Sequence, residues 1–207
     1  MSFNARPERV RDQIFLILSA WGMTDDLAAT TADVMLETDL IGVDSHGISM
    51  LMTYETKRGE GRFDFTARPK VVKENAVAAL MDAGGNLGHP VSVEAMKLAM
   101  AKARETSVGV VSVRNSHHFG AAGYYAKLAA DEGLVGWVAS GARGITVVPT
   151  GAANPILGTN PLAFAAPATR NRPFVLDMAT STVAVGKVKV YGFQNKPIPW
   201  DQRHNGP

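Results

Sequence analysis

The hydrophobic periodicity of this chain changes once, near residue 70, and that change constrains the fold more than any other feature. Up to about residue 62, apolar side chains recur every three or four positions, which is typical of amphipathic helices. Gly22, Gly42 and Gly59 interrupt the pattern and predict where helices end. Three helices are therefore expected, the second capped by Thr24, over residues 7–21, 24–40 and 44–59.

Beyond residue 70, short apolar runs rich in β-branched residues alternate with helical stretches. Strands are expected at 77–81, 108–113 and 134–139, and helices at 91–105 and 121–130. This βαβαβ order is typical of an α/β domain, in which ligands approach the strand ends and the adjoining loops. Two later runs, 162–165 and 174–176, predict short antiparallel strands. The fold class is therefore α/β, with an N-terminal helical domain over residues 1–69 and a mixed α/β domain over residues 70–207.

Composition and charge exclude several classes of function. With 207 residues and 46% hydrophobic content, the chain can bury a substantial core. Its 21 basic and 19 acidic residues are spread along the sequence without a basic block, so no nucleic acid partner is expected. The absence of cysteine excludes disulfides, thiolate catalysis and cysteine-bound zinc. No apolar stretch approaches the ~20 residues of a membrane span and residues 1–11 lack a signal-peptide pattern, so a cytoplasmic protein without membrane contact is expected.

Four of the five histidines lie in short segments rich in Gly, Ser and Asn rather than on helix faces: His46, His89, His117 and His118. Imidazole titrates near neutral pH and loops commonly carry active sites, so this placement favours chemistry over packing. A structural alternative is that Ser45 and His46 cap the third helix. Zinc bound by His46, His89 and His118 is another alternative, but the regular i, i+4 ligand spacing is missing and no metal site is predicted.

Three further segments have both a structural and a functional interpretation. Gly84, Gly85 and Gly88 follow a strand and precede a helix, but their spacing is not G-x-G-x-x-G, which favours a glycine-rich turn. Residues 158–161 fit an ordinary Asn-Pro turn. In residues 177–181 an acid is followed by hydroxyl side chains that can cap the next helix, where backbone amides could bind an anionic group.

Four segments, taken in order, resemble the type-2 malate/L-lactate dehydrogenase family, which also contains enzymes acting on sulfolactate, ureidoglycolate and diketogulonate. They are Asp44-Ser45-His46-Gly47, Asn115 to Tyr125, Gly158 to Phe164 and Leu176 to Thr180. The resemblance covers residues 7 to about 199. It implies an NAD(P)-dependent oxidoreductase without a Rossmann fold, in which a helical domain packs on a mixed α/β cofactor-binding domain, usually as a homodimer.

The resemblance also implies roles for individual residues. His46 and His118 are expected at the reacting centre, where either could give or take the proton of a substrate hydroxyl while hydride passes between nicotinamide and a substrate carbon. Ser45 and His46 are expected to bind the substrate, a small 2-hydroxy acid or its 2-oxo counterpart. NAD or NADP is expected to contact Gly158, Thr159, Asn160, Asp177, Met178, Ala179 and Thr180.

Three departures from the family pattern support a competing hypothesis. Met50 stands where the family commonly has an arginine expected to bind the substrate carboxylate, and Gly141-Ala142 replaces an Asn-Ser or similar pair, for which Ser140 or Arg143 could compensate. The chain also stops at Pro207, earlier than family members, as in a C-terminally truncated member. The alternative is therefore a catalytically impaired protein that retains the fold and the oligomer surface; a metal-dependent hydrolase using the histidines is a weaker third hypothesis.

Overall fold

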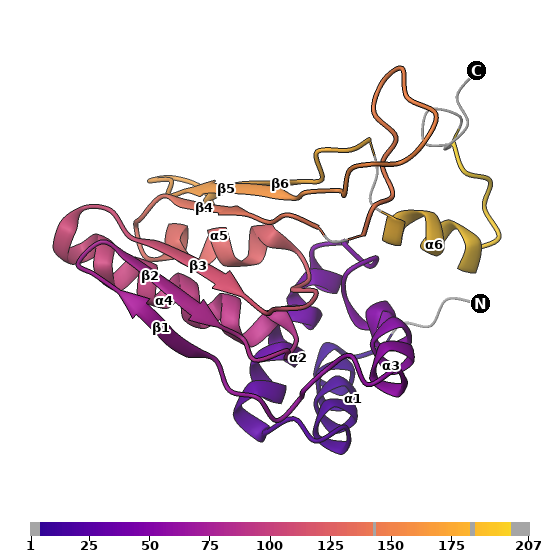
Figure 1. The fold of residues 1–207 in the computed structure, drawn as a ribbon, viewed down its shortest axis with the longest axis horizontal. Helices are drawn as coiled ribbons and strands as arrows, with labels where there is room; N and C mark the ends of the chain where they lie inside the picture. Colours follow the sequence, from indigo (N-terminus) through magenta and orange to yellow (C-terminus); the bar gives the residue numbers. More distant parts are fainter. Residues whose placement is uncertain (1–4, 143, 183–184, 200–207) are drawn as a thin grey trace.

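The computed structural model describes residues 5–142, 144–182 and 185–199, and it has an α/β fold (Figure 1). The helices are α1 (Pro7–Ala20), α2 (Asp25–Leu40), the 3-10 turn η1 (Ile48–Met50), α3 (Leu51–Gly59), α4 (Gly88–Thr106), α5 (Ala122–Asp131) and α6 (Val185–Phe193). The strands are β1 (Lys70–Glu74), β2 (Ala78–Asp82), β3 (Val110–Arg114), β4 (Gly136–Ala139), β5 (Leu162–Ala166) and β6 (Phe174–Met178). The fold class predicted from the sequence is confirmed.

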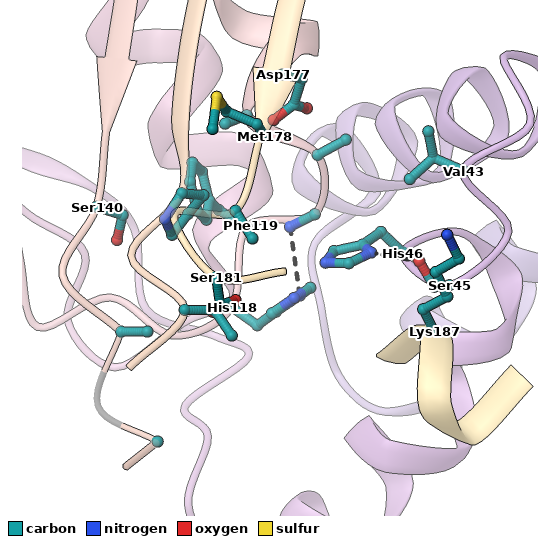
Figure 2. A pocket seen from close by; sticks show the side chains of 18 of the residues that line it. Val43, Ser45, His46, His118, Phe119, Ser140, Asp177, Met178, Ser181 and Lys187 are labelled. Atoms are coloured by element: carbon teal, nitrogen blue, oxygen red, sulfur yellow. Dashed lines mark hydrogen bonds between the residues drawn. The ribbon is translucent and has the colours of Figure 1, made fainter. Parts of the chain in front are cut away.

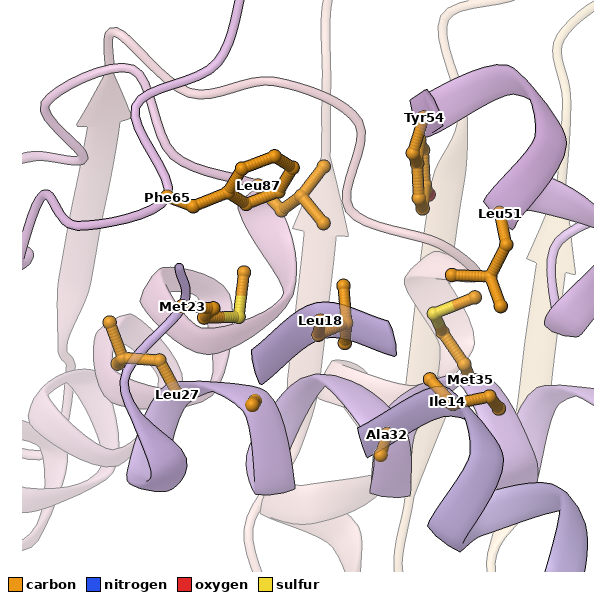
Figure 3. Packing of buried hydrophobic residues seen from close by; sticks show 11 residues of the cluster. Ile14, Leu18, Met23, Leu27, Ala32, Met35, Leu51, Tyr54, Phe65 and Leu87 are labelled. Carbon is orange, nitrogen blue, oxygen red and sulfur yellow. The ribbon is translucent and has the colours of Figure 1, made fainter. Parts of the chain in front are cut away.

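The N-terminal helices pack into one hydrophobic core. Ile14 and Leu18 of α1 are fully buried against Met35 of α2, and Leu51 and Tyr54 of α3 close the same cluster (Figure 3). These apolar positions are the ones that the three-to-four-residue periodicity selects. Side chains from the segments beyond α3 join them, so this core extends beyond the three helices.

The first sheet has the order β1-β2-β3. β1 pairs antiparallel with β2, and β2 pairs parallel with β3 through the crossover helix α4. The helix packs closely on the sheet where it meets Gly109, because a methyl group there would lie 1.9 Å from the Ala99 carbonyl oxygen. This part is the strand-helix-strand unit that the alternating pattern predicts.

The second sheet has the order β4-β5-β6, and all of its pairings are antiparallel. The antiparallel arrangement expected for the two later strands is confirmed, but the placement of β4 in one βαβαβ sheet with β2 and β3 is wrong. β4 pairs with β5, more than twenty residues away, and α5 covers their common inner face through small side chains: Ala122, Ala126, Ala130, Ala163 and Ala165. Such long-range pairing leaves no signal in local periodicity.

Other local expectations differ from the structure at element ends. β1 was not predicted, because its five residues are all exposed and carry charged side chains at an edge. Thr24 stands at the N-cap position of α2, but its hydroxyl donates to the Asp26 carboxylate instead of capping the helix. The third helix begins later than expected, after η1.

Helix α2 connects the helical part to the α/β part. Val34 of α2 is buried with Val93 of α4 and Tyr125 of α5. α4 and α5 also contact each other, so they join the two sheets. The domain boundary between residues 69 and 70 stays a prediction. Within the described ranges, no helix has the length and apolar character needed to cross a bilayer.

Candidate active site

A cleft of about 740 Å³ lies where the helical part meets the second sheet. Its walls come from six places: the loop after α2, the α3 helix, the segment between β3 and α5, the segment between β4 and β5, the end of β6 with the residues that follow, and α6. Figure 2 shows His46 and His118 facing each other inside it, with Asp177 and Met178 on the sheet side and Lys187 on α6. Segments far apart in the sequence thus meet here, including all four that carry the family resemblance.

His118 is held through its Nδ1 atom. The Tyr54 hydroxyl lies 2.6 Å from Nδ1, and the backbone N–H of Gly120 donates to the same atom at 3.3 Å. A backbone N–H can only donate, so in the neutral ring Nδ1 is the acceptor and Nε2 carries the proton. The hydroxyl of Tyr125 donates to the carbonyl of Phe119 and anchors the same segment.

Glycine is required beside this segment. A Cβ atom at Gly88 would lie 2.5 Å from the Cβ of Phe119 and 2.7 Å from the carbonyl oxygen of His117. Gly120 has a φ of +75°, a left-handed conformation that favours glycine, and a side chain there would meet His89. The glycine-rich turn read from the sequence therefore serves close packing of α4 against the segment that carries His118.

His46 follows a loop that Asp39 positions. The Asp39 carboxylate accepts the backbone N–H of Ile48 at 2.8 Å and fills the space in which a side chain at residue 47 would lie. Ser45 and His46 therefore do not cap the third helix, as the structural alternative held. The Ser45 hydroxyl lies 2.8 Å from His46 Nδ1 instead, and the His46 ring stacks on the His118 ring with centroids 5.4 Å apart.

Burial lowers the pKa of both rings. Burial is the main cause that lowers the pKa of His118 well below its ordinary value, followed by the proximity of His46, His89 and Lys57. Burial also lowers the pKa of His46, and the Asp177 carboxylate partly opposes that shift. Two stacked imidazoles cannot both carry a positive charge at low cost, so at most one is protonated at a time.

His89 lies behind His118 and outside the cleft. It is fully buried in the first turn of α4, its ring centroid is 6.2 Å from that of His118, and neither of its nitrogen atoms has a hydrogen-bond partner. Burial lowers its pKa to about 3. No group of three or more His, Cys, Asp or Glu side chains among the described residues is arranged to hold a metal ion.

The depressed pKa of His89 predicts a specific loss of stability in acid. The folded-state pKa of about 3 is below the unfolded value near 6.5, so below that value the unfolded chain binds the proton more tightly. The contribution is present above pH ~6.5 and is lost as the pH falls toward 3, by roughly 3 kcal/mol at pH 4. Urea unfolding of wild type and His89→Leu at pH 7 and pH 4 measures the difference. An equal acid-induced loss in both proteins would contradict the prediction.

The residues expected to contact the cofactor separate into two groups. Thr159, Asp177, Met178 and Ala179 line the cleft. The other three, Gly158, Asn160 and Thr180, are not among its lining residues. Gly158 packs on Ala142, where a Cβ atom would approach the carbonyl oxygen to 2.5 Å.

Several of these polar groups already bond within the protein. The Asp177 carboxylate accepts the Gly123 backbone N–H at 2.7 Å, which satisfies a free donor in the first turn of α5. The side-chain oxygen of Asn160 accepts the N–H of Ala142 at 2.9 Å. Asp177 thus caps α5, which lies far away in the sequence.

Sequence reasoning missed three residues that shape this site: Tyr54, Asp39 and Lys57. Tyr54 and Asp39 hold the two histidine-bearing segments, and Lys57 lines the cleft. Their sequence signals are those of ordinary helix residues, so nothing local distinguishes them. Met50 packs against the helical core, Ser140 lines the cleft, and Arg143 lies outside the described residues.

Comparison with known proteins relates the whole described chain to one family. The family model described as malate/L-lactate dehydrogenase matches residues 5–204. A malate dehydrogenase from Pyrococcus abyssi is 42% identical over 193 residues, which cover 91% of this chain and 53% of that protein. An L-sulfolactate dehydrogenase from Methanocaldococcus jannaschii is 38% identical over 183 residues, which cover 88% of this chain and 53% of that protein.

Solved structures give the same result. The malate dehydrogenase of Entamoeba histolytica superposes with a TM-score of 0.92 at 34% identity, over 97% of this chain and 55% of that one. The malate dehydrogenase of Pyrococcus horikoshii gives 0.85 at 41% identity, over 90% of this chain and 53% of that one. The chain therefore spans about half the length of the relatives it matches.

Proposed function

The chain belongs to the malate/L-lactate dehydrogenase family, and from this premise we propose that it is an oxidoreductase interconverting a small 2-hydroxy acid and its 2-oxo acid with NAD or NADP. The observation that carries the proposal is the stacked pair of His46 and His118 inside the cleft, with centroids 5.4 Å apart. A histidine held in one orientation beside an open cavity is suited to transfer a proton to or from a substrate oxygen.

The cleft suits a nicotinamide cofactor. Its volume of about 740 Å³ is that of a small-molecule site, and small residues at 120–122 and 141–142 leave its wall open to a flat ring. Phe119, Pro161 and Met178 supply apolar surface. Thr159, Asp177, Met178 and Ala179 would hold the cofactor from the sheet side. When bound, nicotinamide supplies the hydride that reduces the oxo carbon.

His118 is the proposed acid/base. Tyr54 and Gly120 hold Nδ1, so Nε2 is the atom left to meet a substrate oxygen. Protonation of the ring places a second proton on Nδ1, and this N–H can donate a hydrogen bond to the Tyr54 hydroxyl oxygen, because a hydroxyl both donates and accepts. The imidazolium then gives its Nε2 proton to the oxo oxygen as that oxygen becomes a hydroxyl, which leaves the neutral ring with its proton on Nδ1. Oxidation runs in reverse from this tautomer, whose Nε2 takes the hydroxyl proton.

His46 and Ser45 are the proposed substrate-binding residues. The Ser45 hydroxyl orients the His46 ring through Nδ1, which leaves Nε2 available for a hydrogen bond to a substrate oxygen. The stacked rings place this contact next to His118. His46 thus positions the oxygen while His118 exchanges its proton.

Because the pKa of His118 is low, protonation of this ring depends on the charge of the substrate. Near neutral pH the ring is neutral in the free protein, because burial and nearby positive charge disfavour the imidazolium. A carboxylate entering the cleft favours the charged ring and raises its pKa. Proton transfer is thereby coupled to the presence of an acidic substrate.

Cofactor binding followed by turnover tests the proposal. We expect NADH or NADPH to bind saturably, as measured by nicotinamide fluorescence. The bound cofactor should then be oxidised when a 2-oxo acid is added. Binding without turnover across a panel of 2-oxo acids would favour the alternative of a catalytically impaired family member. A folded protein that binds neither dinucleotide would contradict the proposed function.

A further inference from the structure

His89 is a fully buried titratable residue that the proposed chemistry does not use. It lies in the first turn of α4 with 0% of its surface exposed, and neither of its ring nitrogens has a hydrogen-bond partner. Burying a polar atom without a partner costs free energy, so folded proteins rarely keep such an atom without a use. His89 therefore carries a cost that an apolar residue of similar size would avoid.

His89 is fixed next to the pair formed by Tyr54 and His118. Its ring centroid lies 6.0 Å from that of Tyr54, with the rings at 75°, and 6.2 Å from that of His118. The backbone N–H of Gly88 donates to the carbonyl oxygen of His118 at 2.9 Å, which ties the start of α4 to the segment that carries His118. Nε2 of His89 faces Gly120, since a Cβ atom there would lie 3.0 Å from it. The Gly120 N–H and the Tyr54 hydroxyl share Nδ1 of His118, so Nε2 of His89 lies on their side of the ring.

The hydroxyl hydrogen of Tyr54 needs a second acceptor during the proposed reaction. While His118 is neutral with its proton on Nε2, Tyr54 donates to Nδ1 over 2.6 Å. In the imidazolium, and in the neutral ring that remains after the Nε2 proton has been given up, Nδ1 carries a proton and donates to the Tyr54 oxygen. The hydroxyl hydrogen must then turn away from His118. Tyr54 is fully buried, so bulk water cannot accept this hydrogen, and an unpaired donor would destabilise the form of His118 that has a proton on Nδ1.

We infer that His89 is this second acceptor, and therefore a positioning residue that acts on His118 through Tyr54. The Tyr54 hydroxyl donates to Nδ1 of His118 in the resting protein and to Nε2 of His89 once Nδ1 carries a proton. No covalent bond breaks, because the hydroxyl keeps its hydrogen and only its hydrogen-bond partner changes. Burial lowers the pKa of His89 to about 3, so near neutral pH the ring is neutral and retains an acceptor nitrogen. The inference rests on the proposed function, since it concerns how the proposed acid/base holds its proton.

Two substitutions of His89 and a double-mutant cycle test the inference. His89→Leu removes both nitrogens, whereas His89→Gln keeps an oxygen near the position of Nε2. We expect kcat for 2-oxo acid reduction to fall about 10-fold in His89→Leu and to recover in His89→Gln, with KM little changed. In a Tyr54→Phe background, which has no hydroxyl hydrogen to be accepted, His89→Leu should lower kcat no further. A wild-type kcat in His89→Leu, or losses that add in the double variant, would overturn the inference.

Val91→Ala is the matched control for loosening of α4. Val91 lies two residues beyond His89 on the same helix and is also fully buried. Its truncation should lower the free energy of unfolding without changing kcat, because Val91 packs against Met81, Ala83 and Ala95 of another cluster. A kcat loss in Val91→Ala as large as that in His89→Leu would show that His89 acts only through packing, which would also overturn the inference.

Nitrogen NMR of the His118 ring gives a readout that needs no turnover. The ring shifts report the fraction of molecules with a proton on Nδ1, and only these molecules use the second acceptor. At pH 7, His89→Leu should lower this fraction about 10-fold, and Val91→Ala should leave it unchanged. An unchanged fraction in His89→Leu would overturn the inference even in an active enzyme. A lowered fraction in a chain without any turnover would instead contradict the proposed function and leave the inference standing.

Discussion

Replacing His118 with asparagine is expected to lower kcat for 2-oxo acid reduction by a factor of about 10²–10⁴ in a protein that still folds. The asparagine side-chain oxygen lies near the position of Nδ1 and can accept the hydrogen bonds of Tyr54 and the Gly120 N–H, but an amide cannot exchange a proton. The measurement is the steady-state oxidation of NADH or NADPH. Cofactor affinity should change little, because the acid/base acts on the substrate oxygen.

His46→Asn is the matched comparison for His118→Asn, since the two rings stack and the resemblance allows either to be the acid/base. If His46 positions the substrate oxygen, its loss should raise KM more than it lowers kcat. A pH profile adds a second readout, because the wild-type rate should depend on an ionisation that disappears in His118→Asn. A larger loss of kcat in His46→Asn than in His118→Asn would make His46 the acid/base and His118 the residue that positions the substrate oxygen.

Replacing Tyr54 with alanine is expected to destabilise the protein by about 3–5 kcal/mol. Tyr54 is fully buried, its ring contacts Phe63, His89 and His118 edge-on or tilted, and its side chain closes the helical core. Truncation leaves a cavity in a close-packed region and removes a hydrogen bond to His118. Equilibrium unfolding in urea gives the free-energy change.

Tyr54→Phe separates the contribution of the buried ring from that of the hydrogen bond, because it keeps the ring and removes the hydroxyl. Its cost should be about 1 kcal/mol, the value of one hydrogen bond, while kcat falls because His118 loses a partner at Nδ1. Burial raises the pKa of the Tyr54 hydroxyl, so the hydroxyl stays protonated and the variant should change the activity at all accessible pH values. A Tyr54→Ala protein as stable as Tyr54→Phe would show that the ring does not support the core.

The helices and most strands could be predicted from the sequence because their apolar patterns are local. The spacing of Ile14, Leu18 and Met35 selects the buried faces of α1 and α2, and glycines mark the helix ends. β1 could not be predicted because an exposed edge strand carries no apolar alternation. The division of the strands between two sheets could not be predicted either, because β4 pairs with β5 and strand pairing depends on residues that are distant in the sequence.

The candidate site could be predicted in part. Four histidines stand out in the sequence because they lie in segments rich in Gly, Ser and Asn, and the family resemblance singles out His46 and His118. The structure brings the rings of these two residues together. Tyr54, Asp39 and Lys57 could not be found, since a helical tyrosine, aspartate or lysine looks the same whether it supports a site or faces solvent. Asp177 was found, but its bond to Gly123 of α5 depends on how β6 lies against that helix.

The sequence by itself determined the α/β class, the family, the limits of most elements and the identity of the two histidines, because each of these rests on local pattern or on motifs that stay in order along the chain. Only the tertiary structure decided which atoms of these histidines are held, which neighbours lower their pKa values and which cations share their cleft. The physical reason is that hydrogen bonds, burial and charge act over a few ångströms in space, while their partners, such as Tyr54 and His118, lie 64 residues apart in the chain.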